Sequence, residues 1–181
     1  MNTLIIDAKS GTSGAGRGAK VANLYCEVNE NIKHMQLEVT DIPRRLKNQL
    51  GYAANETVKL SFTPHLVPMN RGILVTEYAS LKKEVTKAEI REIYETYYGK
   101  EPFIRILDDG VCPETKWVEG SNYADIGFQI DPRTNRIILM GAIDNLVKGA
   151  DRAGGTEYEP SVWIQGTGRS GTDSDVSVKI P

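Results

Sequence analysis

The sequence predicts an α+β fold organised around one sheet. Five segments show the two-residue alternation or the continuous apolar run of strands, namely residues 58–62, 73–79, 103–107, 124–130 and 137–143. One strongly amphipathic helix is expected over residues 86–98, because Ile90, Ile93, Tyr94 and Tyr97 share a helical stripe that is expected to be core. The last two strands flank the turn cluster 131–135 and are expected to pair as a hairpin.

Composition limits the classes of function. The chain has 181 residues and a net charge of −2, which suits one domain and gives no reason to expect nucleic acid or an anionic membrane as a partner. We find no apolar run that would span a bilayer and no signal peptide, so a cytoplasmic location is expected. Cys26 and Cys112 form neither a zinc spacing nor a disulfide framework, and free thiols are therefore expected.

Residues 4–6 are expected to form a short buried strand, and the segment 9–20 that follows is rich in Gly and Ser, with Arg17 and Lys20 near its end. Such a loop can direct backbone N–H groups at an anion, and it can equally be a flexible surface loop. It is not a dinucleotide fingerprint, because no second parallel strand pattern follows at the required spacing.

Alternation over residues 35–39 indicates a possible strand. Thr40 or Asp41 can cap a helix over residues 42–50, which Gly51 is expected to end. The connection 62–72 carries Pro64 and Pro68, which should stop the flanking strands. It also carries His65 and Arg71, which either serve a site or merely cap a turn and pair with a carboxylate.

The amphipathic helix that ends at residue 98 has clear start and stop signals. Thr86 and Glu89 have the spacing of a capping box, and Gly99 is a suitable stop. We divide the chain into a domain at residues 1–150 and a divergent tail at residues 151–181. The tail is expected to form a strand, a loop and a strand, because apolar alternation recurs at 162–164 and 176–180.

Several motifs, in order along the chain, resemble one family. Residues 62–73 read Phe-Thr-Pro-His-Leu-Val-Pro-Met-Asn-Arg-Gly-Ile, and residues 142–149 read Ala-Ile-Asp-Asn-Leu-Val-Lys-Gly. Together with the Gly-rich segment 5–17 and the stretches 27–31 and 113–122, they resemble N-acetyl-gamma-glutamyl-phosphate reductase, the NADP-dependent reductase of arginine biosynthesis. The resemblance covers most of residues 3–150.

The resemblance implies a particular domain and a particular site. The domain would be the C-terminal substrate-binding and dimerisation domain of the glyceraldehyde-3-phosphate dehydrogenase-like reductases, a mixed, mostly antiparallel sheet with helices on one face. Asn145 and Lys148 would contact the cofactor, which is NADP in the family. The positions that would bind the substrate or another anion are Ser10, Ser13, Gly14, Ala15, Gly16, Arg17, His65 and Arg71.

The chain also departs from the family pattern. Neither cysteine lies in the family's Gly-Cys-Tyr-Pro-Thr context, and residues 39–45 lack the family's His-Arg-His, so we assign no catalytic residue. The nucleotide-binding domain would precede the first residue, and the tail differs from the family's long helix. We therefore expect no tightly bound NADP and no turnover from this chain alone, because the missing groups act as a unit.

Two functional hypotheses remain open. In the first, the chain is the substrate-binding and dimerisation domain of the reductase and binds phosphate weakly. In the second, the fold serves as a reused or engineered non-catalytic scaffold or interaction module. A homodimer formed through the sheet is expected, since one amphipathic helix cannot cover both faces of five strands and most homo-oligomers are two-fold dimers. The competing expectation is that the tail or the short helices near residues 21–50 cover the remaining face and leave a monomer.

Overall fold

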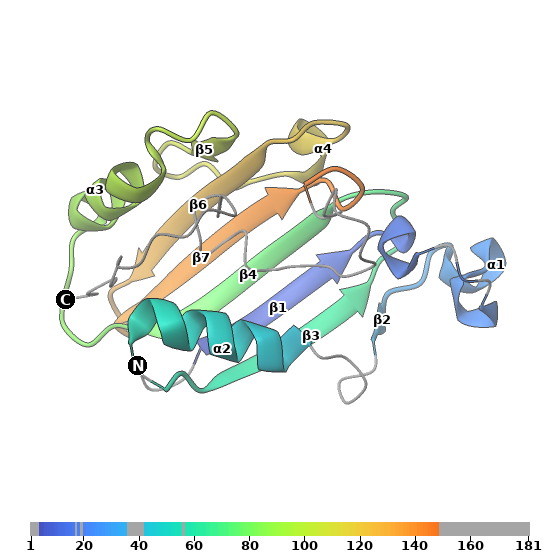
Figure 1. Cartoon of the computed structure of the whole chain (residues 1–181), viewed down its shortest axis with the longest axis horizontal. Helices are drawn as coiled ribbons and strands as arrows, with labels where there is room; N and C mark the ends of the chain where they lie inside the picture. The colour runs from blue at the N-terminus through green and yellow to red at the C-terminus, as the bar shows by residue number, and fades with distance from the viewer. Residues whose placement is uncertain (1–3, 17, 19, 36–41, 56, 149–181) are drawn as a thin grey trace, which may run out of the picture.

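The computed structural model describes residues 4–16, 18, 20–35, 42–55 and 57–148. These residues form a seven-stranded sheet in the order β2-β3-β1-β4-β7-β6-β5 (Figure 1). The strands are β1 (Leu4–Ser10), β2 (Lys33–His34), β3 (Leu60–Leu66), β4 (Ile73–Ser80), β5 (Ile104–Ile106), β6 (Ala124–Asp131) and β7 (Arg136–Ile143).

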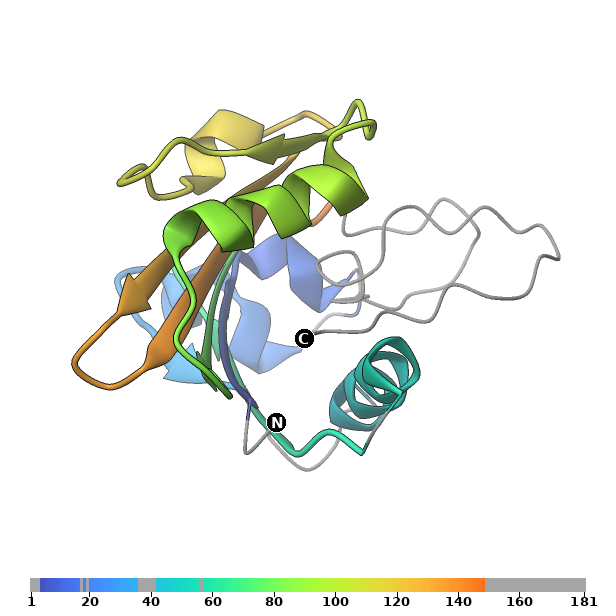
Figure 2. The same ribbon diagram turned by 90° about the vertical axis from the view of Figure 1, so that its left-hand side faces the viewer.

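The predicted fold class is confirmed. Four of the neighbouring strand pairs are antiparallel, and two, β1 with β3 and β5 with β6, are parallel. The two longer helices, α2 (Ile42–Ala54) and α3 (Lys87–Tyr98), lie on the same face of the sheet (Figure 2). The shorter helices are α1 (Tyr25–Val28), α4 (Thr115–Val118) and the 3₁₀ turns η1 (Thr12–Ala15) and η2 (Val21–Asn23).

The core lies between the sheet and these two helices. Alternate residues of each strand point into it, beginning with Leu4, Ile6 and Ala8 of β1. Leu46 of α2 and Ile90 of α3 pack against these residues from the helical side of the sheet. The predicted capping box starts α3: the N–H of Glu89 donates to Thr86 Oγ1 over 3.2 Å, and the N–H of Thr86 donates to Glu89 Oε2 over 2.7 Å.

The prediction that Pro64 ends its strand is wrong, because β3 continues to Leu66. The N–H of Met35 donates to the carbonyl oxygen of Pro64 over 2.9 Å, so the backbone nitrogen and carbonyl oxygen of Pro64 are on the side of β3 that faces β2. That side of β3 is the edge of the sheet, where β2 has only two residues. A missing N–H is tolerated there, since few ladder bonds need it.

Other expectations for the elements need correction as well. Gly51 does not end α2, which continues to Ala54. The expectation that no second parallel strand follows β1 at the spacing of a dinucleotide fingerprint agrees with the structure, because β3 pairs in parallel with β1 only after η1, η2, α1, β2 and α2. Most of the strand expected at 35–39 and all of the tail at 151–181 lie outside the described residues.

The opposite face of the sheet carries a row of apolar side chains. Ile5 of β1 is paired with Tyr78 of β4, which is paired with Ile138 of β7. Ile5 and Tyr78 are 43% and 36% exposed, whereas their sequence neighbours on the helical face are buried. The two long helices do not reach this row, because they cover the other face (Figure 2).

Candidate functional site

The Gly-rich segment that follows β1 packs against the loop between β3 and β4. The N–H of Gly11 donates to the Gly72 carbonyl over 2.9 Å, and the N–H of Thr12 donates to the Met69 carbonyl over 2.8 Å. Gly72 has a φ of +101°, a backbone angle that side chains resist. A Cβ at Gly72 would also lie 2.8 Å from Thr115 Cβ, so glycine is required there on two grounds.

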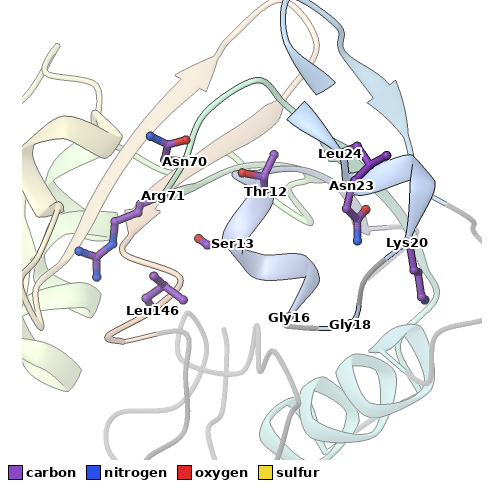
Figure 3. Close-up of a pocket in the computed structure, with 10 residues that line it drawn as sticks. All are labelled: Thr12, Ser13, Gly16, Gly18, Lys20, Asn23, Leu24, Asn70, Arg71 and Leu146. Atoms are coloured by element: carbon purple, nitrogen blue, oxygen red, sulfur yellow. The ribbon is translucent and has the colours of Figure 1, made fainter. Parts of the chain in front are cut away.

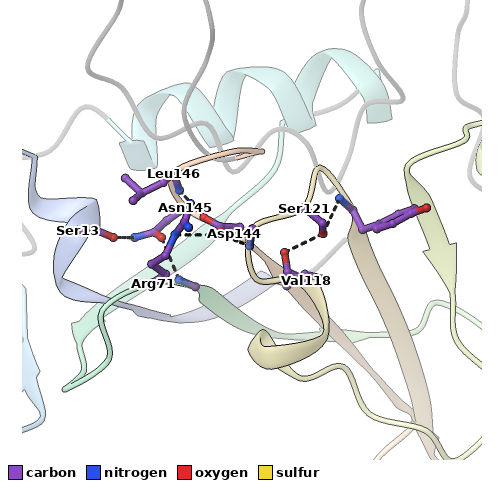
Figure 4. Close-up of polar contacts among 10 residues, drawn as sticks. Ser13, Arg71, Val118, Ser121, Asp144, Asn145 and Leu146 are labelled. Carbon is purple, nitrogen blue, oxygen red and sulfur yellow. Dashed lines mark hydrogen bonds and ion pairs between the residues drawn. The ribbon is translucent and has the colours of Figure 1, made fainter.

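Asn145 joins three parts of the chain. Its Oδ1 accepts the N–H of Gly72 over 2.9 Å, and its Nδ2 donates to Ser13 Oγ over 2.9 Å (Figure 4). Asn145 is only 6% exposed. A Cβ at Gly14 would lie 2.6 Å from Ser10 Oγ and 3.2 Å from Asn145 Nδ2, so the close approach of η1 to Asn145 needs glycine at position 14. Asn145 therefore fixes η1 against the loop before β4.

Arg71 is positioned by a fully buried carboxylate. Its Nε lies 3.2 Å from Asp144 Oδ2 in an ion pair that lacks the alignment of a hydrogen bond. Asp144 also accepts two backbone N–H groups, that of Gly120 at Oδ2 and that of Leu146 at Oδ1, each over 2.7 Å (Figure 4). These bonds hold the carboxylate in place, and the carboxylate in turn holds the Arg71 side chain, which is one-third exposed.

A cavity of about 430 Å³ opens where these segments meet. Arg71, Asn70 and Leu146 lie on one side of it in Figure 3, and Lys20, Asn23 and Leu24 lie on the other. The remaining lining residues are Thr12, Ser13, Gly16 and Gly18. Among these residues two are cationic and none is acidic, so the lining favours a negatively charged ligand.

The expectation that backbone N–H groups of the Gly-rich segment would hold an anion needs correction. The N–H groups of Gly11, Thr12, Ser13, Gly14 and Gly16 all donate to carbonyl groups of the chain itself. They are used to fold η1 and to attach it to residues 69–72, because a buried donor needs a partner. These five N–H groups are therefore engaged within the chain rather than directed at an anion.

Several predicted site residues lie in the cavity and others do not. Ser13, Gly16 and Arg71 line it. Ser10, Gly14 and Ala15 belong to the same loop but are not among the lining residues, and Arg17 lies outside the described residues. His65 is elsewhere, with its ring beside Asp7 and His34.

The two residues assigned to a cofactor by resemblance have structural contacts. The Asn145 amide binds Gly72 and Ser13, and the Lys148 Nζ lies 5.8 Å from the centre of the Phe103 ring. Burial lowers the pKa of Lys148, and the nearby Glu101 charge opposes that shift. Both side chains therefore have partners within the chain, and their assignment to a cofactor stays a prediction.

Sequence reasoning missed other lining residues and the residue that positions Arg71. Thr12, Lys20 and Asn70 lie inside the quoted motifs or beside them but were not assigned to the site. Asp144 precedes Asn145 in the motif 142–149. It follows a continuous apolar strand directly, and an acidic residue in that place was the signal that could have identified it. Within the described residues, no group of three or more His, Cys, Asp or Glu could hold a metal ion, and no helix is long and apolar enough to cross a membrane.

Comparison with known proteins identifies the family of this domain. Residues 1–145 match the family model described as semialdehyde dehydrogenase, dimerisation domain. The chain is 63% identical over 150 residues to an N-acetyl-gamma-glutamyl-phosphate reductase of Lachnospira eligens, and 60% identical over 149 residues to one of Lachnoclostridium phytofermentans. Each alignment covers 82% of this chain and 43% of the relative, so the chain spans less than half the length of these relatives.

The fold has solved counterparts at low sequence identity. An aspartate semialdehyde dehydrogenase II from Vibrio cholerae superposes with a TM-score of 0.63 at 15% identity, over 82% of this chain and 51% of that one. A probable aspartate-semialdehyde dehydrogenase from Pseudomonas aeruginosa gives 0.62 at 13% identity, over 80% of this chain and 50% of that one. These likenesses support the fold alone, and the match to the family model covers most of the chain. The chain belongs to the semialdehyde dehydrogenase dimerisation-domain family.

Proposed function

We propose that this chain is the substrate-binding and dimerisation part of an N-acetyl-gamma-glutamyl-phosphate reductase. The observation that carries the proposal is the cavity lined by two cationic residues, Lys20 and Arg71, of which Arg71 is held by buried Asp144. N-acetyl-gamma-glutamyl phosphate carries negative charge on its acyl phosphate and on its α-carboxylate, with a polar acetamido group beside the latter. The lining offers two cations together with the hydroxyl groups of Thr12 and Ser13.

The residues have distinct roles in this proposal. Arg71 and Lys20 bind anionic groups of the substrate, and we propose Arg17 as a further cation for the same ligand. Ser13 contributes its hydroxyl to the lining while its Oγ accepts from Asn145. Asp144 and Asn145 are positioning residues, because they act through Arg71 and through η1. NADP would be bound by residues outside this chain, and when bound it would supply the hydride for the reduction.

A phosphate titration followed by ¹H–¹⁵N NMR tests the cavity. Inorganic phosphate should shift the amide signals of Thr12, Ser13 and Asn70. Arg71→Gln should weaken phosphate binding about tenfold. A charge-assisted hydrogen bond contributes roughly 1.5–3 kcal/mol, and the one-third exposure of the Arg71 side chain reduces that contribution. Lys20→Gln should weaken binding as well. Arg133→Gln is the matched control, because Arg133 is 86% exposed and pairs with Asp131 in the β6–β7 turn. Equal affinities for Arg71→Gln and Arg133→Gln would contradict the proposal.

We further propose that two copies associate through the face of the sheet opposite the helices. The support is the row Ile5, Tyr78 and Ile138, which runs across three adjacent strands and carries two exposed apolar side chains. The family description, dimerisation domain, supports self-association of this domain. A stable interface of this kind buries about 1,200–2,000 Å².

Light scattering coupled to gel filtration tests the dimer. The wild-type chain should have twice the monomer mass, and Tyr78→Glu should give a monomer because it places a charge in the middle of the apolar row. Tyr52→Glu controls for the added charge, since Tyr52 is 77% exposed on α2 over the opposite face. A monomer mass for the wild-type chain at high concentration, or a dimer that survives Tyr78→Glu, would refute this interface.

A further inference from the structure

The sequence contains two histidines, and the fold brings both to one place. His34 of β2 stands directly opposite His65 of β3 in the antiparallel register (β2 and β3 form one edge of the sheet in Figure 1). Their ring centres are 4.4 Å apart, and the ring planes are tilted by 47°. Neither histidine lines the cavity described above.

The register explains why the two imidazoles are so close. The N–H of Met35 donates to the Pro64 carbonyl over 2.9 Å, so Met35 and Pro64 form a hydrogen-bonded pair of the ladder. The next pair, His34 with His65, is therefore a non-hydrogen-bonded pair. Side chains approach most closely at such pairs, where the Cα atoms are about 4.5 Å apart. The backbone thus presents two imidazoles side by side at the sheet edge.

The surroundings of His65 fix its tautomer. Its Nδ1 lies 3.3 Å from the Ala8 carbonyl oxygen and 3.3 Å from Asp7 Oδ1. Both neighbours are acceptors, so in the neutral ring the proton belongs on Nδ1, which leaves the lone pair on Nε2. Lys9 Nζ donates to the same Asp7 oxygen over 2.6 Å and holds the carboxylate in position. An imidazole whose second nitrogen donates to a carboxylate and a carbonyl has the orientation typical of metal-ligating histidines.

We propose that His34 and His65 form a two-imidazole chelate for a divalent transition-metal ion such as Zn²⁺, with Asp7 as the positioning residue of His65. Neutral imidazole is a preferred ligand of zinc, copper and nickel. His34 is exposed and His65 is 15% exposed, so an ion reaches both from solvent. Rotation of the exposed His34 ring brings its nitrogen to the same ion as His65 Nε2, and water fills the remaining positions.

The proposal requires two protein ligands only. Asp7 acts through His65, so the site is compatible with the finding that the described residues contain no cluster of three or more metal-binding side chains. The exposed thiols of Cys26 and Cys112 are the competing zinc ligands in the chain. The test therefore uses the full chain without a histidine tag in a Cys26→Ser, Cys112→Ser background.

Calorimetric titration with ZnCl₂ gives the first readout. One Zn²⁺ per chain should bind, and His34→Gln should remove that binding without affecting the fold, because His34 is exposed. Asp7→Asn should weaken binding about 10–100-fold, the effect usual for the outer partner of a metal-ligating histidine. Absence of saturable binding, or equal binding by His34→Gln, would overturn the proposal.

Imidazole ¹⁵N NMR gives a second readout that a purely structural role would not affect. Before zinc is added, His65 should be the Nδ1–H tautomer, and its Nε2 signal should move on addition of Zn²⁺ together with one nitrogen of His34. Because the chain has only these two histidines, the assignment follows from a single His34→Gln spectrum. An Nε2–H tautomer at His65, or zinc-induced shifts confined to other residues, would refute the site.

Discussion

Glu77 should make the stability of this domain fall as pH rises from about 5 to about 8. The residue sits on β4 among Ile73, Val75 and Ala79, which face the core, and it is only 8% exposed. Beside it is a cavity of about 20 Å³ lined by Tyr94, Ile126 and Leu139 among others. Burial raises the pKa of Glu77 from 4.5 to about 7, because the charged carboxylate loses its hydration.

The sign and size follow from the two pKa values. Between about pH 4.5 and about pH 7 the folded protein keeps a proton on Glu77 that the unfolded chain has released, so the folded state loses stability as pH rises. The full difference is about 3 kcal/mol, at 1.36 kcal/mol for each unit of pKa. About 2.5 kcal/mol of this should be lost between pH 5 and pH 8.

Urea unfolding of the wild type and Glu77→Gln over this pH range measures the effect. Because the amide does not titrate, the difference in unfolding free energy between the two proteins should change by about 2.5 kcal/mol from pH 5 to pH 8. Glu92→Gln, an exposed carboxyl on α3, controls for the loss of one negative charge. A difference that is constant with pH would show that Glu77 is solvated or paired in the folded protein, and it would refute the reasoning.

Two further predictions concern contacts within the fold, and two concern the proposed site and its chemistry. Thr86→Ala removes the acceptor that caps α3 and should lower the unfolding free energy by about 1 kcal/mol in urea, whereas Thr86→Ser should preserve most of it. Gly72→Ala meets both a positive φ and Thr115, and it should cost more than about 1 kcal/mol and shift the Asn145 side-chain amide signals in NMR. Arg17→Ala should weaken phosphate binding without changing the unfolding midpoint, and unchanged affinity would remove Arg17 from the site. In a coupled assay with the acyl-phosphate substrate, the chain alone should oxidise no NADPH. Substrate-dependent oxidation would contradict the expectation that this chain contains no catalytic residue.

Local patterns predicted most strands and the bounds of α3, but they missed β2, and Ile93 and Tyr97, which were expected in the core, are 38% and 45% exposed. The alternation at 73–79 and 124–130 marked β4 and β6, and Thr86 with Glu89 marked the start of α3, because these signals depend on neighbouring residues only. The same alternation places Glu77 on the buried face, although a buried carboxylate contradicts the usual rule for charged residues. The continuation of β3 through Pro64 depends on which side of the strand is the sheet edge, and this is a property of the whole sheet.

The site was only partly predictable for a related reason. The Gly-rich segment and Arg71 were identified as one site, and they do meet in the cavity. The use of the loop's N–H groups could not be foreseen, because those of Gly11, Thr12 and Ser13 donate to carbonyl groups within residues 69–72, more than fifty residues away in the sequence. His65 was assigned to the site because it shares a motif with Arg71, but alternation along β3 directs it to the opposite face of the sheet from Phe62 and Leu66.

Titration of the chain with a non-hydrolysable phosphonate analogue of N-acetyl-gamma-glutamyl phosphate tests the central claim most directly. The account predicts saturable binding, with amide shifts concentrated at Ser13, Asn70 and Leu146 around the cavity. It also predicts tighter binding than either inorganic phosphate or N-acetylglutamate, because the analogue offers both ends of the substrate to one cavity. Shifts at other residues, or an affinity no higher than that of phosphate alone, would contradict a substrate-binding role and favour a non-catalytic scaffold.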